Sequence, residues 1–215
     1  MSKIIGFSGL AGSGKDTAAD LLCSYDKSKY QKMSFGDAVK DVAAAAFGWP
    51  RDLLQGGTSE SRAFREVPDE FWSKVLNKPF TPRLALQLIG TECFRNTIDN
   101  NFWIYVVQNR IMSEQDKEKT FLVTDVRFPN EVKMIHDLGG IVLRIKRGTL
   151  PNWYIDASNY NKQKAEGLTV ELPKSLENIH VSETALAGLN LEDFVITNNG
   201  TFDDLLKAVL NHVER

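Results

Sequence analysis

The sequence predicts an α/β protein of the P-loop type, in which a mostly parallel sheet forms the middle of a three-layer sandwich. Two observations carry this prediction. A glycine-rich stretch follows the apolar run 4–8 and precedes a segment with helical spacing, which is the strand, loop and helix order of a phosphate-binding loop. Further apolar runs alternate with helical segments, an order that favours a parallel sheet covered on both faces. These runs are 31–35, 120–124, 140–146 and 194–197.

Two interruptions of this alternation indicate how the chain is organised. Residues from about 37 to 115 carry helical patterns and no strand signal, so we expect a helical insertion that binds an acceptor. Residues from about 148 to 174 are polar and contain two prolines, so we expect an irregular, lid-like segment. A chain of 215 residues is rather short for two independent folding units, and residues 1–215 are predicted to form a single domain.

Composition excludes several classes of protein. Hydrophobic residues make up 42% and charged residues 25% of the chain, values that are ordinary for a soluble enzyme. No membrane-spanning or secretory pattern is present, so we expect a cytoplasmic protein without a membrane partner. A formal net charge of -2 and a pI of about 6.0 provide no broad basic surface for duplex DNA. Overall charge therefore favours a small anionic ligand.

The strongest signal is the stretch Gly9-Leu10-Ala11-Gly12-Ser13-Gly14-Lys15-Asp16-Thr17, which matches the GxxxxGK pattern of nucleotide-binding loops. Its glycines let successive backbone N–H groups point at phosphate oxygens, and the following helix adds the positive end of its dipole. We expect Lys15 to bridge the β- and γ-phosphates. The candidate cofactor-binding loop is therefore 10–17.

One departure from this pattern concerns the metal. The usual serine or threonine directly after the lysine is replaced by Asp16, and the hydroxyl appears at Thr17. This order resembles the Gly-Lys-Gly-Thr of adenylate-kinase-like enzymes, in which water supplies much of the Mg²⁺ shell. It favours small-molecule kinases and makes Thr17 a candidate Mg²⁺ ligand, directly or through water. Alternatively, Asp16 caps the helix N-terminus, where a carboxylate contributes about 0.3–1 kcal/mol.

A second acidic position ends the apolar run before residue 126. Asp125 is predicted to lie at the carboxyl edge of the sheet beside the metal, although a turn or cap residue is an alternative. Val126 stands where hydrolytic motors generally carry a glutamate, which favours transfer over hydrolysis, and the absence of an Asn-Lys-x-Asp motif disfavours a GTPase. Arg127 is well placed to neutralise charge on a transferring phosphoryl group.

Candidate acceptor-binding residues lie in the helical insertion. Arg62 and Arg65 are three apart on a predicted helix, so both can face one phosphate. A polar stripe at a spacing of four consists of Gln87, Thr91 and Arg95. Trp72 is a candidate for stacking on the acceptor base, with a place in the core as the alternative. For each arginine, a solvated helix face with salt bridges is the alternative.

Four positions in the C-terminal half of the chain complete the candidate site. Arg144 and Arg147 precede the lid-like segment and are expected to close over the phosphates, with a solvated strand end as the alternative. The stretch 195–201 resembles the adenine-contacting loop of several P-loop kinases, with Asn199 as its candidate contact; a plain strand, turn and helix is the alternative. Residues 180–183 begin a helix, where His180 serves as a cap or contacts a ligand.

Five segments together resemble the deoxynucleoside monophosphate kinases of tailed bacteriophages: Phe7–Thr17, Thr58–Arg62, Leu86–Arg95, Asp125–Glu131 and His180–Glu183. The resemblance implies transfer of the γ-phosphoryl group of ATP to a deoxynucleoside monophosphate, with Mg²⁺, in the cytoplasm of an infected bacterial host. A homodimer is a possible assembly. We assign catalytic roles to Lys15, Asp125, Arg127, Arg62 and Arg65, and acceptor binding to Arg62, Arg65, Trp72, Gln87, Thr91, Arg95 and Arg147.

Three alternative functions stay open at this point. A P-loop kinase that phosphorylates 5-hydroxymethyluracil in phage DNA would look similar, would require a carboxylate base, and would have nucleic acid as its partner. A kinase for another small molecule, such as a coenzyme precursor, would differ in its acceptor. A regulatory or assembly protein would bind ATP without transferring phosphate.

Overall fold

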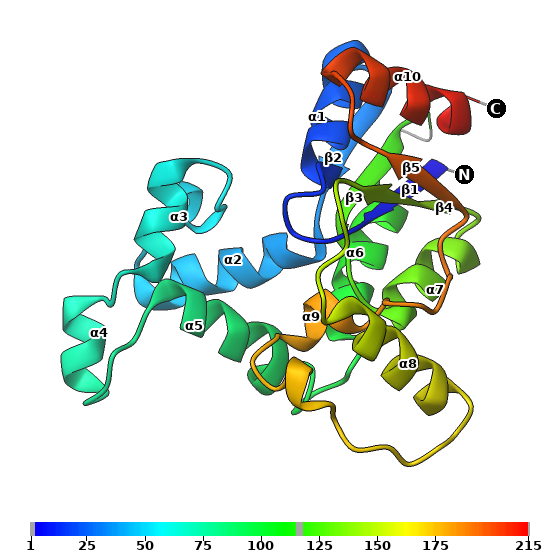
Figure 1. Cartoon of the computed structure of the whole chain (residues 1–215). Coiled ribbons are helices and arrows are strands. Elements are labelled where there is room, and N and C mark those ends of the chain that lie inside the picture. Colours follow the sequence, from blue (N-terminus) through cyan, green and yellow to red (C-terminus); the bar gives the residue numbers. More distant parts are fainter. Residues whose placement is uncertain (1–2, 115–117, 215) are drawn as a thin grey trace. The chain divides into compact units, whose positions relative to one another are not determined.

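Figure 1 shows the computed structural model, which describes residues 3–114 and 118–214. Of these, the residues up to Ser34 and from Ser113 onwards form one compact unit, and Phe35–Met112 form another. We call the first the sheet unit and the second the helical unit.

The described part of the sheet unit contains one five-stranded sheet in the order β2-β3-β1-β4-β5, with every neighbouring pair parallel. The strands are β1 (Lys3–Ser8), β2 (Tyr30–Met33), β3 (Thr120–Val126), β4 (Ile141–Lys146) and β5 (Phe194–Thr197). They coincide with the five apolar runs, so the predicted P-loop α/β fold is confirmed. The chain leaves β1 toward β2 on one side and later builds β4 and β5 on the other, and doubly wound sheets bind ligands at such a point.

Helices cover both faces of this sheet. Helices α1 (Lys15–Tyr25) and α10 (Phe202–Val213) pack on one face, in a cluster that includes Ile5 and Phe7 of β1 (Figure 1). Helix α7 (Pro129–Asp137) packs on the other face, where the side chain of Ile135 lies so close to Gly6 that a β-carbon would collide with it. Successive residues of β1 thus point to opposite covered faces, which explains its continuous apolar sequence.

The stretch that we expected to be irregular contains a helix, so that part of the prediction is wrong. Tyr154–Ala165 form α8, followed by the short elements η3 (Lys174–Leu176) and α9 (Val181–Thr184). Asn161 anchors α8 by donating hydrogen bonds from Nδ2 to the carbonyl oxygens of Thr184 (2.7 Å) and Ala187 (3.0 Å). A helix of such polar composition buries only a narrow stripe, so its apolar signal is weak. Its function as a lid stays a prediction.

The described elements of the helical unit are α2 (Phe35–Phe47), η1 (Arg51–Leu54), α3 (Ser59–Glu66), α4 (Glu70–Val75), α5 (Pro82–Gln87), the π-helix η2 (Leu88–Cys93) and, apart from its last residue, α6 (Phe102–Ser113). An aromatic cluster holds this unit together: Phe47 stacks on Trp49 with ring centroids 4.5 Å apart, and the rings of Phe47 and Trp72 lie nearly perpendicular with centroids 5.1 Å apart. No helix in residues 3–114 or 118–214 is long and apolar enough to cross a bilayer.

The expected polar stripe of the helical unit is interrupted by the π-helix η2. The indole Nε1 of Trp103 donates a hydrogen bond to the carbonyl oxygen of Gly90 (2.8 Å) within η2. The α-helix α5 ends at Gln87, Thr91 lies in η2, and Arg95 follows η2 in a turn. Gln87 is exposed, whereas Thr91 and Arg95 are half-buried. These three residues therefore do not form the single α-helical face that the spacing predicted.

Candidate active site

The phosphate-binding loop connects β1 to α1 and depends on its glycines. Gly9, Gly12 and Gly14 have positive φ angles of 138°, 77° and 97°, which side chains disfavour. A β-carbon at Gly14 would also collide with the side-chain amide of Asn198. The N-cap of α1 is Gly14, which has no side chain that could accept hydrogen bonds from the first amides of the helix. These amides are therefore available to an anion.

Two buried polar side chains of the loop point to the kind of ligand it binds. Lys15 is only 6% exposed, and it makes no hydrogen bond or ion pair with the residues that the structure describes. Ser13 Oγ is likewise buried without a partner in the same residues. Leaving such groups unpaired is costly, so both fit a loop that receives phosphate oxygens.

The electrostatics around Lys15 agree with its burial. Desolvation lowers the pKa of Lys15, and the nearby Arg127 guanidinium lowers it further. The carboxylates of Asp16, Glu183 and Asp125 act in the opposite direction. The ammonium group therefore sits between a cation and several carboxylates at the carboxyl end of the sheet.

The end of β3 places two predicted residues near the loop. β3 lies beside β1, with Val126 paired to Ser8, so Asp125 and Arg127 flank the strand end next to the loop. The buried carboxylate of Glu131 accepts hydrogen bonds from the backbone N–H groups of Arg127 (2.7 Å) and Phe128 (3.1 Å). These two bonds fix the turn from which the Arg127 side chain leaves.

Arg127 is also held at its guanidinium end. Its Nη1 forms an ion pair with the Glu183 carboxylate and donates a hydrogen bond to Ser182 Oγ (3.3 Å). The other carboxylate oxygen of Glu183 accepts a hydrogen bond from the backbone N–H of Ala11 in the loop (3.3 Å). His180 is the N-cap of this helix, with its ring nitrogen Nδ1 accepting from the Ser182 N–H (3.2 Å). The capping alternative for His180 is thereby confirmed.

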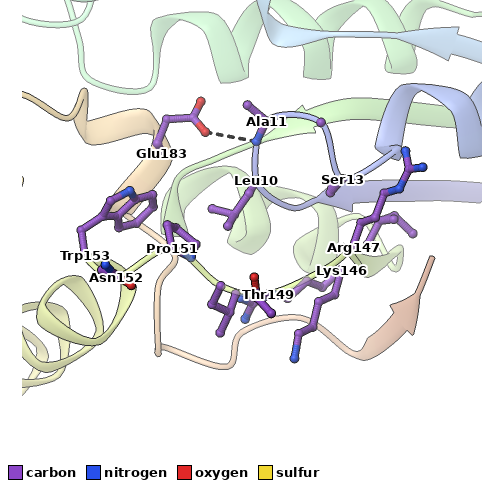
Figure 2. A pocket seen from close by; sticks show the side chains of 14 residues that line it. Leu10, Ala11, Ser13, Lys146, Arg147, Thr149, Pro151, Asn152, Trp153 and Glu183 are labelled. Carbon is purple, nitrogen blue, oxygen red and sulfur yellow. Dashed lines mark hydrogen bonds between the residues drawn. The ribbon is translucent and has the colours of Figure 1, made fainter. Parts of the chain in front are cut away.

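A cavity of about 730 Å³ opens beside the loop (Figure 2). Its walls come from Leu10–Ser13, from the end of β4 and from the residues that lead into α8, among them Trp153. Three cations and one carboxylate line it, namely Arg144, Lys146, Arg147 and Glu183. Its positive balance and its place beside the loop suit a polyphosphate with an attached base.

The two predicted lid arginines behave differently. Arg147 is exposed and lines the cavity. Arg144 also lines it, but its guanidinium donates a hydrogen bond to the hydroxyl of Tyr154, which in turn accepts one from the Gly188 N–H (3.3 Å). Arg144 therefore connects β4 to α8 as well as facing the cavity.

The remaining predicted residues are divided between the units. Thr17 lies half-buried in α1. Gly14 and not Asp16 is the N-cap of this helix, but the Asp16 carboxylate lies in its first turn, where the helix dipole favours it, and it pairs with Lys32 (3.3 Å). Asn199 Oδ1 accepts a hydrogen bond from the Gly148 N–H (2.9 Å). The candidate acceptor residues of the helical unit are Arg62, Arg65, Trp72, Gln87, Thr91 and Arg95.

Within the helical unit, the candidates differ in their surroundings. Arg62 is exposed on α3, whereas Arg65 is half-buried and its guanidinium lies against Gly56. Trp72 packs in the aromatic cluster, with its Nε1 donating to the carbonyl oxygen of Phe47 (3.2 Å). Their roles in acceptor binding stay predictions.

Sequence reasoning missed two supports of the loop. The buried Asn198 donates a hydrogen bond from Nδ2 to the carbonyl oxygen of Ser13 (2.9 Å), and Ser8 Oγ donates to the Glu192 carboxylate (2.9 Å). Both partners come from the C-terminal quarter of the chain. Local pattern contains no signal for them, because each bond joins residues more than 180 positions apart.

The described residues do not provide a magnesium site in which protein side chains supply all the ligands. Among the described residues, no group of three or more histidine, cysteine, aspartate or glutamate side chains is arranged to hold a metal. Thr17 in α1 and Asp125 in β3 would supply a hydroxyl and a carboxylate, and their role as ligands stays a prediction. This donor set fits Mg²⁺, which usually keeps several waters and takes its other ligands from substrate phosphates.

Similarity to known proteins identifies the family of this chain. The model of the family described as deoxynucleotide monophosphate kinase matches residues 57–209, which is more than half of the chain. The chain belongs to this family. A provisionally named deoxynucleotide monophosphate kinase of Acanthamoeba polyphaga mimivirus is 26% identical over 220 residues, covering 98% of this chain and 96% of that one. The deoxynucleoside-5'-monophosphate kinase of Escherichia phage T5 is 26% identical over 184 residues, covering 64% and 73%.

The family assignment confirms the resemblance inferred from the five sequence segments, and with it the prediction of a nucleotide kinase. A solved structure supports the fold of this kinase. The dephospho-CoA kinase from Campylobacter jejuni superposes with a TM-score of 0.51 at 12% identity, covering 100% of this chain and 96% of that one. At such low identity the likeness shows the shared P-loop kinase fold alone.

Proposed function

We propose that this family member transfers the γ-phosphoryl group of ATP to the phosphate of a deoxynucleoside monophosphate, giving the diphosphate and ADP. The observation that carries the proposal is Lys15, a buried cation that makes no hydrogen bond or ion pair with the described residues, in a glycine-rich loop beside a cation-lined cavity. Membership of the deoxynucleotide monophosphate kinase family supports the acceptor class. The phage T5 relative supports it by its name.

The donor nucleotide is proposed to bind in the sheet unit. Loop amides from Leu10 to Thr17 and the Lys15 ammonium would hold the phosphates, since these groups donate hydrogen bonds to anions at a helix N-terminus. Arg147 would line the phosphate side of the cavity, and Asn199 would lie near the base. When bound near Thr17 and Asp125, Mg²⁺ would neutralise charge on the phosphate oxygens.

The acceptor is proposed to bind through the helical unit. Arg62 and Arg65 are three apart on α3, and guanidinium groups bind phosphate in a bidentate manner. Gln87, Thr91, Arg95 and Trp72 are proposed to contact the sugar and base. A general base is not required, because a phosphate oxygen of the acceptor is already an anionic nucleophile. Catalysis then consists of positioning and charge neutralisation, with Arg127 acting on the transferring phosphoryl group.

The test is ADP release in the presence of ATP and Mg²⁺, measured with a panel of deoxy- and ribonucleoside monophosphates. Release that depends on a deoxynucleoside monophosphate supports the proposal and defines base and sugar specificity. The panel should include hydroxymethylated pyrimidine nucleotides and DNA containing 5-hydroxymethyluracil. Phosphate transfer to that DNA, with no ADP release on any free nucleotide, would overturn the proposal in favour of a DNA kinase.

A further inference from the structure

We propose that Glu183 is a positioning residue, which holds the guanidinium group of Arg127 at the outer end of the phosphate-binding loop. The inference rests on the proposed function, because it assumes that a phosphoryl group is transferred beside Arg127. Glu183 lies on α9 in a part of the chain far from both the loop and β3, and it lines the cavity.

The carboxylate of Glu183 joins two groups of the candidate site. Its Oε1 pairs with Nη1 of Arg127, and its Oε2 accepts the hydrogen bond from the Ala11 N–H (3.3 Å). Figure 2 shows Glu183 reaching the loop at Ala11. Ser182, the preceding residue, accepts a second hydrogen bond from Arg127 Nη1 (3.3 Å). Two adjacent side chains of α9 therefore fix one guanidinium group.

Arg127 is consequently restrained at both ends. Glu131 fixes its backbone through the two N–H bonds at the start of α7, and Glu183 fixes the tip of its side chain. An arginine side chain that is free to rotate has to lose rotamer entropy when it binds a phosphoryl group. Fixing the side chain beforehand removes most of that loss from the transfer step.

The arrangement is compatible with nucleotide binding because the two carboxylate oxygens have different tasks. The bond to the Ala11 N–H is longer than most N–H···O hydrogen bonds and exposed to solvent, so a phosphate oxygen can replace the carboxylate there. The pair with Arg127 uses the other oxygen and is partly buried, with side-chain exposures of 33% and 26%. Glu183 can therefore release the loop and still hold Arg127.

This division makes a specific kinetic prediction for Glu183→Ala. The value of kcat should fall by about 10- to 100-fold, the range expected for a misplaced catalytic group. Affinity for a non-hydrolysable ATP analogue, measured by calorimetry, should be unchanged or tighter, because an anion that competes for the Ala11 N–H is gone. Glu183→Gln keeps a hydrogen-bond acceptor for Arg127 and should retain more of kcat than Glu183→Ala does.

A double-mutant cycle tests whether Glu183 acts through Arg127. In the Arg127→Ala background, removal of Glu183 should have no further effect on kcat. Glu177→Ala is the matched control, since Glu177 is an exposed carboxylate in the same segment and does not line the cavity. The control should leave kcat and analogue affinity unchanged. Thermal unfolding of each variant separates loss of positioning from loss of fold.

Several results would overturn the inference. They are an unchanged kcat in Glu183→Ala, additive losses in the cycle, or a loss confined to analogue affinity. If Glu183→Ala does not fold, Glu183→Gln decides between the outcomes. A lower kcat in Glu183→Gln, with no further lowering when the same change is made in Arg127→Ala, supports positioning. A kcat equal to that of the unaltered protein contradicts positioning. Absence of transfer by the unaltered protein with every acceptor would instead contradict the proposed function.

Discussion

Asn198 donates a hydrogen bond from its buried side-chain amide to the carbonyl oxygen of Ser13, at 2.9 Å. This bond fastens the residue that follows β5 to the middle of the phosphate-binding loop, more than 180 positions earlier in the chain. The same amide leaves no room for a side chain at Gly14. The last strand therefore helps to set the conformation of the loop, in addition to completing the sheet.

Replacement of Asn198 by alanine should weaken both the fold and nucleotide binding. Loss of the bond leaves the Ser13 carbonyl oxygen without its partner, which costs about 1–3 kcal/mol when the group is buried. We expect the free energy of unfolding to fall by that amount and the affinity for an ATP analogue to fall with it. Chemical denaturation and calorimetry measure the two effects. Asn211→Ala, an exposed position on α10, is the control and should change neither.

Replacement of Lys15 by methionine should abolish transfer and leave the nucleotide-free fold at least as stable. The lysine is buried, and its removal eliminates a charge that is desolvated without a partner ion. Thermal unfolding of the nucleotide-free protein and ADP release measure the two consequences. A large loss of stability in the methionine variant would contradict the view that Lys15 is unpaired before nucleotide binds.

The same residue predicts a pH dependence of stability. Burial and the neighbouring Arg127 lower the pKa of Lys15 in the folded protein, while its ordinary value is 10.5. Between the lowered value and 10.5 the unfolded chain binds more protons than the folded chain does, so the Lys15 contribution to unfolding free energy rises with pH. The stability advantage of Lys15→Met should therefore shrink as pH approaches 10.5. A difference that stays constant across this range would refute the assignment.

Glu131 should be important for Arg127 although it lies outside the cavity. Its carboxylate is 1% exposed and accepts the N–H groups of Arg127 and Phe128. Glu131→Ala removes the acceptor of two partly buried N–H groups, and we expect a loss of up to about 2–6 kcal/mol, the sum for two fully buried groups. Denaturant unfolding measures it, with the exposed Glu171→Ala as control. A loss below 1 kcal/mol would show that water satisfies the turn equally well.

Arg62→Ala should raise KM for the deoxynucleoside monophosphate and leave KM for ATP unchanged. A charge-assisted bond to phosphate contributes about 1.5–3 kcal/mol, equivalent to a change of about 10- to 100-fold. Steady-state kinetics with each substrate varied in turn measure the effect. Lys74→Ala on α4 is an exposed cation of the same unit and serves as control. Equal effects of both substitutions would assign the change to overall charge.

Much of the sheet unit could be predicted from the sequence, because its signals are local. The apolar runs that became β1 and β3 are buried on both faces, and the glycine spacing of the loop reflects backbone conformations that only glycine adopts readily. Helix α8 was missed because its polar, aromatic-rich sequence follows Pro151 and buries little beyond Tyr154 and Ala157.

Two features of the protein could not be predicted from the local sequence. The partner of Arg127 is Glu183, 56 positions away, and nothing around either residue identifies the other. The π-helix Leu88–Cys93 has the composition of an ordinary helix, and its widened turn accompanies the bond from the Trp103 indole to Gly90. The Arg127–Glu183 ion pair and the π-helical turn depend on tertiary packing, so they could not be predicted from local patterns in a single sequence.

The most direct test of the central claim is product formation with ATP, Mg²⁺ and each common deoxynucleoside monophosphate, compared between the unaltered protein and Lys15→Ala. The proposed function predicts deoxynucleoside diphosphate and ADP in equal amounts from the unaltered protein. It predicts neither product above background from Lys15→Ala, with the fold of that variant intact by circular dichroism. Near-normal turnover by Lys15→Ala, or ADP release without a phosphorylated acceptor, would contradict it.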